Sequence, residues 1–219
     1  MEVNEILRDI FHLSFPDQYE LSSTFLRFQE HHDSAHFRGK FFSLEEFTDW
    51  YMEHSPLAKA TGRFTYHEQW FGFNIPSHIL DPFYAGRFDP LSDKEKLLLG
   101  EFEALRDKRF YLIGTHGEVS PDVLDHEIAH AFFYTRPDYK KAAMKIVCSV
   151  PVDVIARIHQ GLLTWGCYHP DVLDDETHGY IMTGMEELAR SGIDTNVLQA
   201  AHIQLNENYR AWFGCSKNS

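Results

Sequence analysis

Hydrophobic and polar residues follow two different periodicities along this chain of 219 residues. Between residues 62 and 75 the apolar positions are largely aromatic and alternate with polar ones, which predicts strands. A short apolar run over residues 109–114, bounded by charged residues and a glycine, predicts a further strand. Spacings of three and four between apolar residues predict helices over residues 139–148, 151–163, 171–190 and 194–213. The fold class is therefore predicted to be α+β, with helices dominant.

Three predicted helices begin at recognisable capping residues. Ser43 and Ser92 are each followed three residues later by a glutamate, which is the spacing of a capping box. Ser120 precedes Pro121, and proline is favoured at the first helical position because its fixed φ suits a helix start. These starts predict helices over residues 43–54, 92–105 and 121–135.

The chain is predicted to form a single domain over residues 1–219. Its length suits one sizeable core, and we find neither a repeat nor a low-complexity linker. We expect a helical region over residues 1–60, strands and the helix from Pro121 over residues 61–135, and a helical region over residues 136–213. The small sheet is thus expected in the N-terminal half.

Charge and segment composition exclude several classes of protein. There are 20 Lys and Arg residues against 33 Asp and Glu residues, so the formal charge is −13. Nucleic-acid binding depends on basic residues that neutralise phosphates, and an acidic surface is repelled by anionic membranes. The N-terminal residues match no signal peptide, and no apolar run is long enough to span a bilayer. We expect a cytoplasmic protein that binds neither nucleic acid nor membrane.

The cysteines and most of the 14 histidines indicate no special chemistry. Cys148, Cys167 and Cys215 are odd in number and far apart, so neither a disulfide framework nor a CxxC metal site is expected. The histidine-rich stretch over residues 30–36 is interpreted as a solvated polar segment.

The helix predicted from Pro121 contains the pattern H-E-x-x-H, formed by His126, Glu127 and His130. Two histidines four residues apart lie on one face of a helix, so both imidazoles can reach a single metal ion. Glu127 is rotated by about 100° from His126 and can accept a proton from water activated by that ion. The alternative is an amphipathic helix whose polar face happens to carry two histidines.

The context of this helix favours the metal-binding interpretation. It follows a predicted strand, and it has a clear start. Its other face is apolar, as a metal-binding helix backed by a core requires, and carries Val123, Leu124, Ile128 and Phe132.

The segment over residues 110–134 resembles the HExxH zincin metallopeptidases. The resemblance implies a zincin-like fold, a Zn²⁺ cofactor, and a peptide or protein substrate. It also implies that the strand at residues 109–114 is an edge strand, to which an extended substrate can add by backbone hydrogen bonds. One departure is Asp125, because the position before the first histidine is usually uncharged in zincins.

A catalytic zinc requires a third protein ligand and an open position for water. The metzincin pattern would need a histidine where Arg136 stands and a glycine where Phe133 stands, so that class is excluded. The gluzincin-like pattern takes a glutamate from a later helix, and Glu176 is the best match. The same helix face carries Gly179, Tyr180 and Thr183, of which the small Gly179 would let another helix approach closely.

Several assignments near Glu176 stay open. Asp175, His178 and His169, in that order, are the alternative third ligands, and a solvated acidic helix start is the alternative to any ligand. Tyr180 or His178 would donate a hydrogen bond to the developing oxyanion, as in related zinc peptidases. Asp174 or Asp175 would orient a ligating imidazole.

The sequence thus predicts a zinc metallopeptidase in which His126, His130 and Glu176 bind Zn²⁺. Glu127 is the expected general base, and Tyr180 is the expected second catalytic residue. Two rival functions remain. One is a zinc hydrolase that acts on a non-peptide amide, and the other is a binding or regulatory protein that keeps the zincin fold without turnover.

Overall fold

The computed structural model describes residues 1–70, 72–118, 120–164 and 168–216, with only the backbone of Asp122. The fold is α+β with helices dominant, as predicted. Where we expected one domain, the chain divides into two compact units. Unit 1 contains Met1–Glu5 and Phe11–Val119, and unit 2 contains Ile6–Ile10 and Ser120–Ser219. The boundary falls at the start of the helix that carries H-E-x-x-H.

The described strands form one four-stranded sheet in the order β1-β2-β4-β3. They are β1 (Glu2–Leu7), β2 (Ile10–Phe15), β3 (Gly72–Pro76) and β4 (Tyr111–His116). β3 and β4 are antiparallel, with Gly72 opposite Thr115 and Pro76 opposite Tyr111. The strands predicted over residues 62–75 are therefore only partly present, since residues 66–68 form a 3-10 turn.

The N-terminal 15 residues form a β-hairpin, so the prediction of helix there is wrong. Ile6, Ile10 and Leu13 are spaced like one face of a helix, yet the chain reverses between the first two. Asp9 has a φ of 62°, a left-handed conformation that Asp tolerates better than most residues. The second strand of the hairpin is stabilised by β4, about a hundred residues later, which no local pattern reveals.

β4 confirms the strand predicted near residues 109–114, but it is not an edge strand. It lies between β2 and β3, so both of its hydrogen-bonding edges are occupied within the sheet. The substrate-binding edge implied by the zincin resemblance is therefore wrong for this strand. β3 is the edge strand on that side, and there the backbone N–H of Asn74 donates to Oε1 of Gln29, 3.2 Å away.

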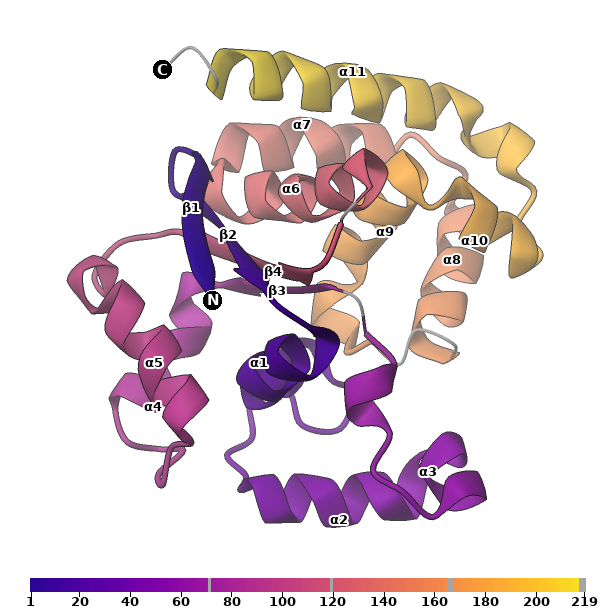
Figure 1. The fold of residues 1–219 in the computed structure, drawn as a ribbon. Helices are drawn as coiled ribbons and strands as arrows, with labels where there is room; N and C mark the ends of the chain where they lie inside the picture. The colour runs from indigo at the N-terminus through magenta and orange to yellow at the C-terminus, as the bar shows by residue number, and fades with distance from the viewer. Residues whose placement is uncertain (71, 119, 165–167, 217–219) are drawn as a thin grey trace. The chain divides into compact units, whose positions relative to one another are not determined.

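The other elements of unit 1 are helices and 3-10 turns (Figure 1). They are α1 (Gln18–Asp33), α2 (Leu44–His54), α3 (Pro56–Thr61), α4 (Asp81–Tyr84), α5 (Asp93–Phe102), η1 (Tyr66–Glu68), η2 (Ser77–Leu80) and η3 (Glu103–Leu105). Both predicted capping boxes, at Ser43 and Ser92, form with their reciprocal hydrogen bonds.

The histidine-rich stretch over residues 30–36 is not wholly solvated, because His31 is buried in α1 and its Nδ1 lies 2.9 Å from the carbonyl of Lys40.

Unit 2 is built from helices, as the sequence predicts for this half of the chain (Figure 1). They are α6 (Pro121–Thr135), α7 (Pro137–Val147), α8 (Val152–Thr164), α9 (Leu173–Thr183), α10 (Met185–Arg190) and α11 (Gln199–Ser216), with 3-10 turns η4 (Pro170–Val172) and η5 (Thr195–Leu198). The single helix predicted over residues 171–190 is interrupted at Gly184, which caps α9. The hairpin turn Ile6–Ile10 joins this unit, where Arg136 donates a hydrogen bond to the carbonyl of Arg8.

None of the described helices is by itself long and apolar enough to cross a membrane. α7 and α8 pass that test only as a pair bent by 114°.

Among the cysteines, Cys148 and Cys215 are exposed thiols, whereas Cys167 lies outside the described residues.

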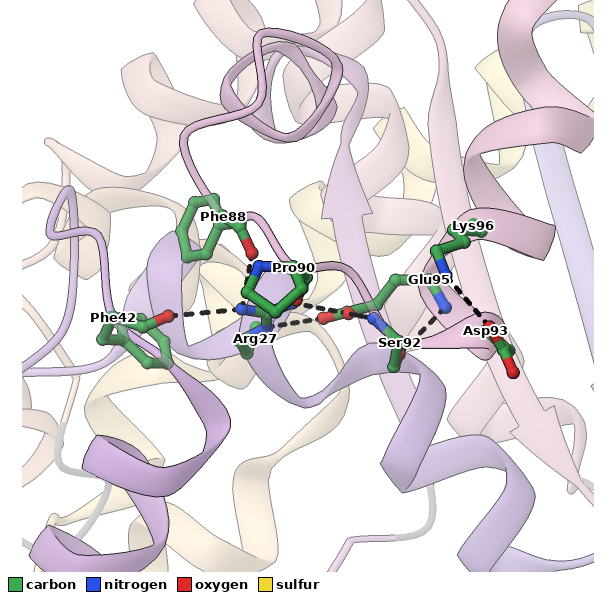
Figure 2. Close-up of polar contacts among 8 residues, drawn as sticks. All are labelled: Arg27, Phe42, Phe88, Pro90, Ser92, Asp93, Glu95 and Lys96. Atoms are coloured by element: carbon green, nitrogen blue, oxygen red, sulfur yellow. Dashed lines mark hydrogen bonds and ion pairs between the residues drawn. The ribbon is translucent and has the colours of Figure 1, made fainter.

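A buried ion pair lies within the aromatic core of unit 1. Nε and Nη2 of Arg27 donate to the two carboxylate oxygens of Glu95, at 2.7 and 2.6 Å, and each side chain is 2% exposed. The remaining guanidinium hydrogens reach backbone carbonyls of Phe42, Phe88 and Pro90 (Figure 2). Because Glu95 also closes the capping box of α5, the pair joins α1, α5 and the chain between them.

Replacing Glu95 by Gln tests how much this ion pair contributes to the stability of the fold. The amide can still cap α5, but it leaves the guanidinium of Arg27 buried without its counter-charge, so we expect a loss of about 3–5 kcal/mol in the free energy of unfolding by urea. Glu68→Gln removes the carboxylate of the exposed pair with Arg63 and should cost less than about 1 kcal/mol. Equal losses in the two variants would contradict this view.

Candidate metal centre

The two histidines of H-E-x-x-H bring their ring nitrogens together on α6. Nε2 of His126 and Nε2 of His130 are 3.1 Å apart, and the rings are nearly perpendicular. Two imidazole nitrogens bound to one tetrahedral zinc at about 2.0–2.1 Å would be separated by about 3.3 Å. The observed separation is therefore close to that of two ligands sharing one ion.

The opposite nitrogen of each ring is held by a hydrogen bond that sets the tautomer. Nδ1 of His126 lies 2.5 Å from the hydroxyl of Thr183, which itself donates to the carbonyl of Gly179 and so accepts from the ring. Nδ1 of His130 donates to Oδ1 of Asp175 at 2.8 Å. With hydrogen on both Nδ1 atoms, the two Nε2 atoms are the positions left to share one cation, as metal ligands require.

The third member of the site comes from α9. A carboxylate oxygen of Glu176 and one nitrogen from each of His126 and His130 all lie within 4.8 Å of one another. Among the described residues these three form a group that can hold a metal ion, and Glu176 is only 9% exposed. Two histidines and one glutamate are the protein ligands of a known class of catalytic zinc site. The structure thus brings together the three residues that the sequence assigned to zinc.

Gly179 allows α9 to approach the two imidazoles. A Cβ atom at this position would lie 3.0 Å from Nε2 of His130 and 3.1 Å from Cε1 of His126. Such distances are tighter than ordinary van der Waals contact, and both rings are fixed by their Nδ1 hydrogen bonds. Any larger residue would push the helix or the rings away from their present positions.

The alternative third ligands lie elsewhere. Asp175 orients His130 from behind, which is the second role the sequence offered for it, whereas Asp174 is exposed. His178 is fully buried, with Nε2 2.8 Å from the hydroxyl of Tyr139, so it is neither a surface residue nor directed at the ion position. His169 caps η4, where its Nδ1 accepts from the backbone N–H of Asp171.

The two predicted catalytic residues lie beside the histidines. The ring of Tyr180 meets that of His126 edge to face, with centroids 5.8 Å apart, and its hydroxyl is 3.4 Å from that of Tyr168. Burial raises the pKa of Tyr180, and the negative charge of Glu176 adds to this, so the phenol keeps its proton near neutrality. Glu127 is partly buried, and its charge acts on both His130 and Tyr180.

The site is electrostatically prepared for a cation. Burial lowers the pKa of His126 to about 3, with further lowering by His130. Burial also lowers the pKa of His130, but the charges of Asp175 and Glu176 outweigh it and raise the pKa to about 10. The pKa of Asp175 is lowered by His130 in spite of burial. The negative charges of the site therefore favour one positive charge at the paired nitrogens.

The unusual residue before His126 has a structural explanation. Oδ1 of Asp125 accepts a hydrogen bond of 2.6 Å from the hydroxyl of Tyr209, which joins α6 to α11. The apolar face predicted for α6 is only partly correct, because Ile128 and Phe132 are buried whereas Val123 is 44% exposed. Both the unusual Asp125 and the exposed Val123 leave His126 and His130 on one face of α6.

From the sequence, Thr183 was expected on the same helix face as Glu176, but no role was assigned to it. Tyr139 was not identified as a candidate residue. The spacing of seven residues between Glu176 and Thr183 is the signal that marks a shared helix face. Tyr139 gave no such signal, because it comes from α7 and meets His178 only in the folded chain.

No known family model, curated protein or solved structure matches this chain. The chemistry of the site is therefore inferred from the geometry of α6 and α9.

Gly179→Ala should disrupt metal binding selectively. The added methyl group meets both imidazole rings, so we expect the affinity for Zn²⁺ to fall at least about tenfold, as for other changes that misplace ligands. Competition with a chromogenic chelator measures it. The matched control is Gly214→Ala in α11, where a Cβ meets nothing within 4 Å and the affinity should not change. Equal zinc affinity in the two variants would show that the close approach at Gly179 is unimportant.

Proposed function

We propose that this chain is a zincin-like zinc hydrolase that cleaves amide bonds, with peptide bonds as the first candidate substrate. The observation that supports it best is the pair of Nε2 atoms of His126 and His130, 3.1 Å apart, with both Nδ1 atoms occupied by other hydrogen bonds. Glu176 supplies the third ligand from α9. Two neutral imidazoles and one carboxylate are the donors of a hydrolytic zinc site with an open position.

The residues around the ligands have roles that suit hydrolysis. Zinc, when bound, supplies a Lewis acid that polarises a carbonyl and makes water nucleophilic near pH 7. Glu127 takes a proton from the attacking water as the new C–O bond forms, and then transfers that proton to the amide nitrogen, so that the C–N bond breaks and the amine leaves. The hydroxyl of Tyr180, which keeps its proton, donates to the carbonyl oxygen as negative charge develops on it.

A non-peptide amide is the second candidate substrate, and the sheet favours it. Binding of an extended peptide was expected at the strand that precedes α6, but β4 is paired on both edges. A small amide needs no such strand. A binding protein without turnover is less favoured, because Glu127 is present and loss of the base is the simplest way to silence this kind of site.

Zinc content tests the ligand set. Protein purified without chelator at pH 7 or above should hold close to one equivalent of zinc by elemental analysis, and less than about half would contradict the proposal. Asp175→Asn should weaken zinc binding about 10- to 100-fold, because it removes the carboxylate that orients His130. Glu176→Gln should weaken it more, since a direct ligand is lost. The reverse order of affinities would overturn the assignment of Glu176.

Glu127→Gln separates binding from catalysis. The variant should keep its zinc, because Glu127 is not among the ligands, and should lose at least about 100-fold in the rate of amide hydrolysis. The assay compares a mixed peptide library with small N-acyl amides, followed by mass spectrometry. Glu207→Gln, an exposed change on α11, is the control and should hydrolyse at the wild-type rate. A Glu127→Gln variant that is as fast as wild type would exclude this mechanism.

A further inference from the structure

A line of polar groups continues from the metal centre into the interior of unit 2. Oδ1 of Asp175, which accepts the hydrogen bond from His130, also faces Nδ1 of His178 at 3.6 Å. On its other side, Nε2 of His178 is 2.8 Å from the hydroxyl of Tyr139. Both His178 and Tyr139 are fully buried. Two buried polar side chains thus lie behind the carboxylate that orients a metal ligand.

Packing fixes the ring of His178 in this orientation. It stacks on Phe133 at 5.1 Å with an angle of 22° between the planes, and it meets the ring of Tyr139 edge to face at 5.5 Å. Phe133 and His130 both belong to α6, so the same helix that carries the ligand also supports the ring behind Asp175. His178 therefore cannot turn without displacing aromatic neighbours.

The tautomer of His178 follows from its two neighbours. If the hydroxyl of Tyr139 donates to Nε2, the ring hydrogen is on Nδ1 and points toward the carboxylate of Asp175. The opposite arrangement would place a lone pair of Nδ1 against a carboxylate oxygen, which is unfavourable in a buried site. At 3.6 Å the contact is longer than a hydrogen bond, so it acts as an attraction between the N–H dipole and the carboxylate.

We propose that Tyr139 and His178 are positioning residues of the metal centre, which hold the carboxylate of Asp175 in the orientation that aligns His130. The inference rests on the proposed zinc site. Asp175 is 25% exposed on its side chain, so packing alone does not enclose its carboxylate and its hydrogen-bond partners must fix its orientation. The Nδ1–H groups of His130 and His178 converge on the same oxygen, Oδ1, and together hold that orientation.

The alternative is that Tyr139 and His178 only satisfy one another within the helical core. Buried hydroxyls and imidazoles need partners wherever they occur, and a pair of this kind would stabilise the fold without influencing zinc. The two explanations differ in one respect. If the pair acts on zinc, it must act through Asp175, and its effect must vanish when that carboxylate is absent.

The test measures zinc affinity in a cycle of variants. Tyr139→Phe should weaken Zn²⁺ binding about three- to tenfold, and His178→Leu about tenfold, by competition with a chelator. His178→Gln should recover much of the loss, because its amide can donate to Asp175 and accept from Tyr139. In the Asp175→Ala background, Tyr139→Phe should have no further effect, since the side chain through which it acts has been removed.

The control is Tyr209→Phe, which removes another buried hydroxyl of unit 2 that is bonded to a carboxylate on α6. It should leave zinc affinity within about twofold of wild type. The visible absorption of the Co²⁺-substituted protein gives a second measure, because it reports the ligand geometry. Tyr139→Phe should change this spectrum and Tyr209→Phe should not.

The outcomes separate the proposals. Wild-type zinc affinity and an unchanged Co²⁺ spectrum in Tyr139→Phe and His178→Leu would overturn this inference alone, whatever their thermal stability. A wild-type chain that binds no zinc would overturn the metal centre and this inference together. A chain that binds zinc with the expected affinity differences, but hydrolyses no amide, would support this inference and overturn only the hydrolase proposal.

Discussion

The close approach of two imidazole nitrogens is the constraint on which the metal centre of unit 2 depends. Nε2 of His126 and Nε2 of His130 face one another at 3.1 Å, so the pair requires one positive charge between the two nitrogens, supplied by a proton on His130 or by a metal ion. The arrangement is maintained because Thr183 and Asp175 hold the far side of each ring. All the partners come from α9, which also supplies Glu176 and the glycine that lets the helices meet.

The two units use buried charge in different ways. In unit 1 the guanidinium of Arg27 is matched by the carboxylate of Glu95 and by three backbone carbonyls, so the pair is complete and serves the fold. In unit 2 the two carboxylates of Asp175 and Glu176 lie beside the paired imidazoles of His126 and His130, where a proton on His130 supplies only one positive charge. An excess of negative charge beside two imidazole nitrogens is a reason to expect a bound cation. A complete ion pair such as that of Arg27 and Glu95 gives no such reason, because its charges already neutralise one another.

Local sequence predicted the elements that depend on neighbouring residues. The capping boxes at Ser43 and Ser92 formed as expected, because each requires only residues three positions apart. The hairpin at residues 2–15 was missed, since its second strand pairs with β4 far along the chain. The edge position expected for β4 was wrong for the same reason, because β2 of the hairpin pairs with the side of β4 that is not paired with β3.

The sequence alone determined that His126 and His130 share a helix face, with Glu127 beside them, because the helical period fixes that geometry. It also offered Glu176, but with Asp175, His178 and His169 as rivals that the spacing could not separate. Only the tertiary structure assigned these four residues to different places, because the choice depends on how α9 packs against α6 and α7. That packing is set by Gly179 and by buried partners such as Tyr139, which no periodicity along the chain reveals.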